Sequence, residues 1–295
     1  MWTIKQRIHF GFFAIGGSTT EQKYIDDERT WTNRLQESLQ KEHRIEVEVI
    51  NTGVSGLRAD HHLATLHHIL DMNPDAVIFV VGINDWNHHI RRHFDNRSKL
   101  ERATATVRKF TKQIALKNTL LGNAISRVRA ISKTKAQKQA KIQVREDHGE
   151  YYTRQRRSLE RPLKYSYRPQ RVMPEYANRL DEISELCHQH KIQCAFITQP
   201  SGYQKAASSE FKAGFWMTPP NEIYTLDFDS MVHISTLYNK YLKKFAAKRG
   251  HLLCDAADKL SPNYESFYDD CHFNVVGAAK MGEVVSKCFQ DMVDH

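Results

Sequence analysis

Residues 9–19 read HFGFFAIGGST, an apolar stretch that runs directly into two glycines, a serine and a threonine. The apolar run His9–Ile15 predicts a strand, and the glycines that follow it predict a tight turn. Such a turn would place the Ser18 hydroxyl at the carboxyl end of the strand, which is the edge where open α/β sheets bind their ligands. Ser18 is therefore a candidate nucleophile, although a serine that caps the next helix would explain the same residues.

Two further predicted strands end in the same kind of segment. The stretch Ile45–Ile50 alternates apolar and charged residues and is followed by NTGVSG, residues 51–56. The continuous apolar run Ala76–Val81 is typical of a buried parallel strand and is followed by GIND, residues 82–85. Because the carboxyl ends of parallel strands meet at one edge of a sheet, we expect the three segments to lie close together.

Helices are predicted between and after these strands, and they set the fold class. The helical patterns cover Arg29–Lys41, Ala59–Leu70, Glu175–His190, Phe228–Arg249 and Val275–Met292, and two more strands are expected at Gln193–Thr198 and His251–Cys254. Strands that alternate with helices in this way favour a parallel sheet covered on both faces. We expect one α/β domain over residues 1–295.

Residues 95–171 interrupt the alternation and form a basic, mostly helical insertion. Residues 91–171 hold 23 Lys and Arg against 6 Asp and Glu, whereas the rest of the chain holds 20 against 28. A heptad stripe runs through the insertion at Leu100, Val107, Ile114, Leu121 and Val128. The stripe suits packing on its own domain, on a second copy in a homo-oligomer or on a membrane surface. The charge suits an anionic polymer or membrane, and since no nucleic-acid module is recognisable we expect no nucleic-acid partner.

Three more polar residues complete a set that acyl transfer requires. Asn84, directly after the third strand, can offer its amide to a developing oxyanion, although an Asx turn would explain it equally well. His272 lies in a polar loop before the last helix, and Asp269, three residues earlier, can orient its ring. With Ser18 they supply a nucleophile, an oxyanion donor, a general base and its orienting carboxylate.

On these residues the sequence resembles the SGNH (GDSL-like) hydrolases, which are named for Ser, Gly, Asn and His in four blocks. The matching residues are Ser18, Gly53, Asn84 and His272, and the Asp of the D-x-x-H block matches Asp269. The first block departs from Gly-Asp-Ser-Leu, since Gly-Gly-Ser-Thr stands there. The resemblance covers the first 90 residues and roughly the last 125, and the insertion lies outside it.

The resemblance implies a three-layer α/β/α, flavodoxin-like domain with a five-stranded parallel sheet. It also implies that Ser18 attacks an ester carbonyl, that His272, held by Asp269, takes the proton, and that the oxyanion binds to the backbone N–H groups of Ser18 and Gly53 and to the amide of Asn84. No cofactor or metal is implied. Histidines 61, 62, 67, 68, 88, 89 and 93 raise a metal site as an alternative, but no Glu stands between His89 and His93 as in H-E-x-x-H.

The expected activity is hydrolysis of carboxylic esters, with acylated or acetylated carbohydrate as the leading class of a small-molecule or glycan substrate. The alternatives are a lipase, a thioesterase or an acyltransferase on the same scaffold. A catalytically inactive protein that binds anionic ligands through the insertion is a further alternative. The sequence fits each of these, because neither acyl length nor the acceptor can be read from the four blocks.

Cysteine usage and apolar runs bear on the compartment. The five cysteines, at 187, 194, 254, 271 and 288, form no CxxC pair and no zinc spacing, and the odd number suits reduced thiols in a cytoplasmic protein. The apolar run of residues 76–83 is too short to cross a bilayer. Since residues 10–15 lead directly into the serine block, we also expect no signal peptide. An anchor upstream of residue 1 is compatible with the sequence.

Overall fold

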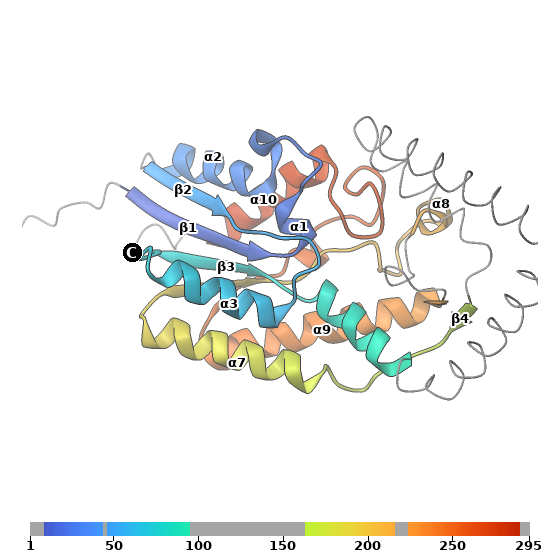
Figure 1. The fold of residues 1–295 in the computed structure, drawn as a ribbon. Coiled ribbons are helices and arrows are strands. Elements are labelled where there is room, and N and C mark those ends of the chain that lie inside the picture. The colour runs from blue at the N-terminus through green and yellow to red at the C-terminus, as the bar shows by residue number, and fades with distance from the viewer. Residues whose placement is uncertain (1–8, 44–45, 95–162, 216–223, 290–295) are drawn as a thin grey trace, which may run out of the picture.

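The computed structural model describes residues 9–43, 46–94, 163–215 and 224–289, and its centre is a five-stranded parallel sheet (Figure 1). The strands lie in the order β2-β1-β3-β5-β7. Their bounds are β1 His9–Gly16, β2 Glu46–Asn51, β3 Ala76–Val80, β5 Gln193–Ile197 and β7 Leu252–Cys254. The parallel pairing confirms the predicted fold class.

Helices cover both faces of the sheet and complete three layers. In Figure 1, α2 (Trp31–His43) and α10 (Val275–Phe289) lie on one face. The other face carries α3 (Ala59–Leu70), α7 (Pro174–Gln189) and α9 (Phe228–Arg249). The short helices are α1 (Ser18–Glu21) and α8 (Ser209–Ala213), with 3-10 turns at Asp27–Arg29 and Ala256–Asp258.

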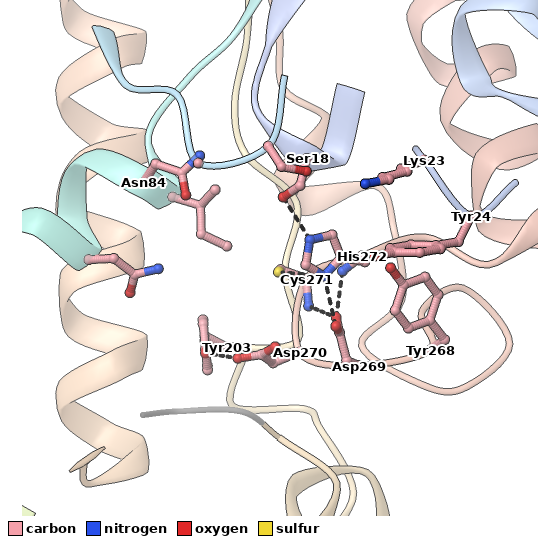
Figure 2. Close-up of a pocket in the computed structure, with 14 residues that line it drawn as sticks. Ser18, Lys23, Tyr24, Asn84, Tyr203, Tyr268, Asp269, Asp270, Cys271 and His272 are labelled. Carbon is pink, nitrogen blue, oxygen red and sulfur yellow. Dashed lines mark hydrogen bonds and ion pairs between the residues drawn. The ribbon is translucent and has the colours of Figure 1, made fainter. Parts of the chain in front are cut away.

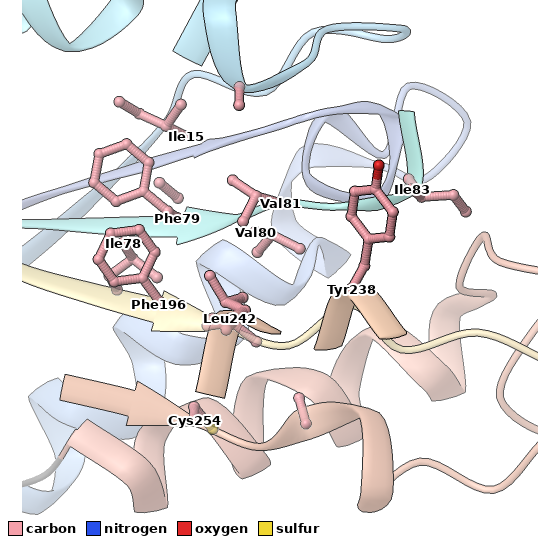
Figure 3. Close-up of a cluster of buried hydrophobic side chains, with 14 of the residues drawn as sticks. Ile15, Ile78, Phe79, Val80, Val81, Ile83, Phe196, Tyr238, Leu242 and Cys254 are labelled. Carbon is pink, nitrogen blue, oxygen red and sulfur yellow. The ribbon is translucent and has the colours of Figure 1, made fainter. Parts of the chain in front are cut away.

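The core forms where the central strands meet the helices. All five residues of β3 are buried, as expected for a parallel strand covered on both faces. Phe79 of β3 stacks on Phe196 of β5 with ring centroids 5.2 Å apart (Figure 3). Phe245 of α9 meets the edge of Phe196, so helix and sheet interlock through aromatic rings. This packing fixes the strands whose carboxyl ends carry the polar segments.

Several elements differ from the sequence-based expectation, including the start of one helix and the whole of another. The helix predicted from Arg29 begins at Trp31, because residues 27–29 form a 3-10 turn instead. Residues 83–94 are helical, and this helix was not predicted. The spacing of Ile83, Trp86 and Ile90, which are all buried, is helical and would have indicated it.

Most of the predicted insertion lies outside the described residues. The heptad stripe falls within residues 95–162, so its helical form and its partner stay predictions. The end of the segment is described: β4 (Leu163–Tyr165) pairs in parallel with β6 (Tyr224–Leu226) in a second, two-stranded sheet. None of the helices in the described ranges is both long enough and apolar enough to cross a membrane.

The prediction of five reduced cysteines is wrong. Cys187 near the end of α7 is bonded to Cys194 in β5, and Cys254 at the end of β7 is bonded to Cys288 in α10. The two pairs have Cα–Cα distances of 6.2 and 5.4 Å, which a disulfide can span. The spacing rules missed them because neither pair has a CxxC or zinc spacing: Cys187 and Cys194 are seven residues apart, and Cys254 and Cys288 are 34 residues apart and meet through helix–sheet packing. Cys271, the one left over, is buried and not disulfide-bonded.

A thiol count tests this pairing directly. Protein unfolded in guanidinium without reductant should release one equivalent of thiol to Ellman's reagent, and fully reduced protein should release five. A Cys271→Ala variant should lower the first value to zero, which identifies the residue. Five thiols before reduction would contradict the structure and restore the expectation from sequence.

Candidate active site

The turn from β1 into α1 holds Ser18 at the carboxyl edge of the sheet, as the sequence predicts. A Cβ atom on Gly16 would lie 2.1 Å from Oγ1 of Thr20, and one on Gly17 would lie 2.5 Å from Nδ2 of Asn84. A side chain at either position would therefore require Thr20 or Asn84 to move. The two glycines therefore allow the serine turn to pack against α1 and the Asn84 side chain.

Trp31 anchors the short helix that begins with Ser18. Its indole N–H donates to the Thr19 carbonyl at 3.2 Å, and its backbone N–H donates to the Gln22 side chain at 2.6 Å. The Trp31 side chain is completely buried. A helix of four residues has little stability of its own, so these bonds and this burial hold the serine in place.

His272 and Asp269 complete a chain of hydrogen bonds to Ser18 (Figure 2). Nε2 of His272 lies 2.7 Å from the Ser18 Oγ, and Nδ1 lies 2.7 Å from Oδ2 of Asp269. The other Asp269 oxygen accepts the backbone N–H groups of Cys271 and His272 at 2.9 and 2.7 Å. Because a carboxylate only accepts, Nδ1 carries the proton and Nε2 is left to accept the hydroxyl hydrogen of Ser18.

Burial and charge have opposite effects on the pKa values of Asp269 and His272. Burial alone would raise the pKa of Asp269, but the charge and hydrogen bond of His272 and two backbone N–H groups outweigh it, and the pKa is lowered. Burial alone would lower the pKa of His272, but the charge and hydrogen bond of Asp269 raise it above its ordinary value. The pair thus favours a charged carboxylate beside an imidazole that readily holds a second proton.

The charge of the neighbouring carboxylate, Asp270, also contributes to raising the pKa of His272, less than Asp269 does, and its contacts lie elsewhere. Asp270 accepts a hydrogen bond from the Tyr203 hydroxyl, and its backbone carbonyl accepts the Gly202 N–H at 2.7 Å. Asp270 therefore ties the histidine loop to the segment after β5. The structure brings Ser18, Asp269 and His272 together and leaves Asp270 outside the hydrogen-bond chain to Ser18.

Asn84 lies on the opposite side of the cavity from His272 (Figure 2). Its amide nitrogen donates to the Leu57 carbonyl at 2.8 Å, which leaves one of its two N–H groups for another acceptor. Asp85 accepts the Ala59 N–H at 3.1 Å, so two consecutive side chains hold the loop that runs from β2 to α3. Asn84 can therefore both shape this loop and face a substrate.

The structure contradicts the role predicted for Gly53. Its N–H donates to the side chain of Asn51 at 2.9 Å, and a Cβ atom on it would lie 2.3 Å from the backbone nitrogen of Glu21. Gly53 packs against the serine helix and its N–H is engaged. Gly56, three residues on, lines the cavity and has a φ of +81°, a backbone conformation that favours glycine. The sequence analysis identified the correct block, residues 51–56, but assigned the role to the wrong glycine within it.

The cavity around Ser18 has a volume of about 350 Å³. Residues that sequence reasoning missed form much of its wall, and they come from the turn after α1, the loop after β5 and the histidine loop: Lys23, Tyr24, Tyr203 and Tyr268. The Tyr268 ring stacks on His272, with centroids 5.5 Å apart and planes within 7°. Lys23 and Tyr24 follow Ser18 closely in the chain, and this closeness could have indicated that they line the cavity.

The histidines that suggested a metal site have other surroundings. Both ring nitrogens of His89 are hydrogen-bonded, to the hydroxyls of Tyr167 and Tyr238 at 3.0 and 3.1 Å. Burial lowers the pKa of His62 to about 3. Within the described ranges, the group with ligand atoms close enough to hold a metal is Asp269, Cys271 and His272. Two of these three, Asp269 and His272, already form the hydrogen-bond chain to Ser18.

Solved structures resemble this fold along nearly the whole chain. TesA is 10% identical, with a TM-score of 0.50 over 96% of this chain and 99% of its own. LAE5, an alpha/beta hydrolase enzyme from the metagenome of Lake Arreo in Spain, is 15% identical, with a TM-score of 0.48 over 97% and 95%. Axe2, an acetylxylan esterase from Geobacillus stearothermophilus, is 12% identical, with a TM-score of 0.47 over 98% and 97%. Similarity at this identity concerns the fold and not the substrate.

Sequence comparison assigns the family. A search of curated protein sequences gave no match. The sequence pattern of the GDSL-like Lipase/Acylhydrolase family, in contrast, matches residues 14–280, a span that includes Ser18, Asn84 and His272. The chain therefore belongs to the GDSL-like Lipase/Acylhydrolase family and is a hydrolase that acts on esters.

Proposed function

We propose that this protein is a serine esterase that removes short acyl groups from carbohydrate through an acyl-enzyme on Ser18. The observation that carries the mechanism is the hydrogen-bond chain in which His272 lies 2.7 Å from both the Ser18 hydroxyl and the Asp269 carboxylate. A serine hydroxyl is a weak nucleophile, and an adjacent neutral imidazole oriented by a carboxylate is what activates it.

The proposed reaction has two halves, and His272 transfers a proton in both. Oγ of Ser18 forms a bond to the ester carbonyl carbon while Nε2 of His272 takes the hydroxyl proton. The C–O bond to the alcohol then breaks, and His272 returns that proton to the departing oxygen. Water attacks the acyl-serine with His272 again as base, which releases the acid and restores Ser18. Asp269 stays charged and stabilises the imidazolium in both steps.

The oxyanion binds on the Asn84 side of the cavity. Its donors are the backbone N–H of Ser18, at the first turn of α1, the second amide N–H of Asn84 and the N–H of Gly56. The first-turn N–H groups of a helix have no partner within the helix, so that of Ser18 suits this role. Loss of one such donor costs about 3–4 kcal/mol of transition-state stabilisation.

The cavity supports a short acyl group and a polar alcohol. Its volume of about 350 Å³ is at the lower end of the range of roughly 300–1,000 Å³ for ligand pockets. Tyrosines, Ser55 and Asn87 contribute hydroxyl and amide groups to the wall, and Ile83 is its one aliphatic side chain other than that of Lys23 among the described residues. A cavity of this volume favours a short acyl group over a long one, and a sugar can use the polar groups of the wall.

Hydrolysis of p-nitrophenyl esters tests the nucleophile and the acyl length together. Ser18→Ala should lower kcat/KM for the acetate by a factor of about 10⁴ or more, because nucleophile and base act as a unit. The matched control is Ser55→Ala. Ser55 lines the same cavity, but its hydroxyl donates a hydrogen bond to Glu21 and does not contact a histidine, so this substitution should lower kcat/KM by less than about tenfold. Wild type should prefer acetate to octanoate. Unchanged activity in folded Ser18→Ala would disprove the mechanism.

The pH profile tests the role of Asp269. Only neutral His272 can accept the serine proton, so kcat/KM should rise with pH through the pKa of His272. Since Asp269 raises that pKa, the midpoint should lie above about 6.5, the ordinary value for histidine. Asp269→Asn removes the charge and should move the midpoint of the residual activity to lower pH. A midpoint below 6.5 that this substitution leaves unmoved would show that Asp269 does not act on His272.

A further inference from the structure

The wall of the cavity beside His272 differs from the wall beside Asn84. Lys23, Tyr24 and Tyr268 lie together on the His272 side, and the Lys23 amine is directed toward Ser18 (Figure 2). All three line the cavity. Lys23 follows α1 directly, after Gln22, whose left-handed backbone conformation ends that helix. The nucleophile and this lysine are therefore five residues apart on one short, anchored segment.

Lys23 brings a positive charge that no carboxylate of the described residues neutralises through an ion pair. The nearest acidic residue in sequence, Glu21, accepts two hydrogen bonds from Ser55. The acidic residues 26–28 that follow do not line the cavity. The two carboxylates that do, Asp269 and Asp270, are buried and bound to His272 and Tyr203. Apart from His272, Lys23 is the one basic residue among the described residues of the wall.

The mechanism decides which half of an ester meets this lysine. The carbonyl oxygen points toward Asn84, because the oxyanion donors lie there. The alcohol oxygen must lie near Nε2 of His272, since it receives its proton from that atom. The alcohol half of the substrate therefore extends along the wall of Lys23, Tyr24 and Tyr268, and the acyl half occupies the remaining space.

We propose that Lys23 selects esters whose alcohol half is anionic: acylated sugars that carry a carboxylate, sulfate or phosphate beside the ester. This inference rests on the proposed function and adds the charge and position of a substrate group to it. The aromatic rings of Tyr24 and Tyr268 offer flat surfaces for a sugar ring, and Lys23 offers a charge-assisted hydrogen bond to its anionic group. Lys23 is exposed, so salt should weaken the interaction.

Three matched substrates separate the effect of the anionic group on kcat/KM from the effect of the sugar ring. The first is a mono-O-acetylated methyl glucuronoside, which has a carboxylate on the sugar, and the second is the equivalent methyl glucoside acetate, which has none. The third is the glucoside hemisuccinate, which has its carboxylate on the acyl group. Wild type should prefer the first to the second by about three- to fivefold in kcat/KM, the size expected for an exposed ion pair, and high salt should reduce the preference. Lys23 should not raise kcat/KM for the hemisuccinate.

Lys23→Gln should abolish this preference and Lys23→Glu should reverse it. The matched control is Lys41→Gln, an exposed lysine ten residues beyond the start of α2, which should keep it. Equal rates for the first two substrates in wild type, or a preference that survives Lys23→Gln, would overturn the inference.

p-Nitrophenyl acetate distinguishes this failure from failure of the proposed function. If its hydrolysis depends on Ser18 while the sugar preference is missing, only the role of Lys23 is wrong. If its hydrolysis does not depend on Ser18, the esterase mechanism itself is wrong.

Discussion

The hydrogen bond between His272 and Ser18 joins residues 254 positions apart in the chain. It can form only if the loop before the last helix reaches the turn after the first strand. The parallel sheet meets this requirement by ending β1, β2 and β3 at one edge, while α10 packs on α2 and holds the histidine loop over that edge. Residues that position this bond include Trp31, which anchors the serine helix, and Asp270, which ties the histidine loop to the segment after β5.

The polar side chains at this edge of the sheet are arranged for proton transfer and oxyanion binding. Asp269 is buried, and it stays charged because His272 and two backbone N–H groups outweigh the cost of burial. Its charge fixes the tautomer of His272 and stabilises the imidazolium of each proton transfer. Opposite it, Asn84 holds the loop that carries Gly56 and faces the same cavity. In the proposed mechanism, proton transfer and oxyanion stabilisation therefore take place on two walls with Ser18 between them, and the lysine and tyrosines on the first wall face the alcohol half of the ester.

Sequence patterns predicted the five strands of the central sheet, most of the longer helices and the position of Ser18, because apolar periodicity and glycine turns are local signals. Asp269 and His272 were recognisable from their spacing. Three features depend on contacts that no local pattern records. The N–H of Gly53 is taken by the Asn51 side chain, so Gly56 and not Gly53 lines the cavity. The two disulfides join a helix to a strand through packing. The wall of Lys23, Tyr24 and Tyr268 unites two segments that lie far apart in the chain.

Covalent labelling measures the central claim most directly. A fluorophosphonate reacts with a serine that a neighbouring histidine activates, and peptide mapping by mass spectrometry locates the adduct. The account predicts one adduct per chain, on Ser18, and predicts that His272→Ala slows its formation severely while the fold is kept. An adduct on another serine, or labelling of Ser18 at the same rate without His272, would contradict the account.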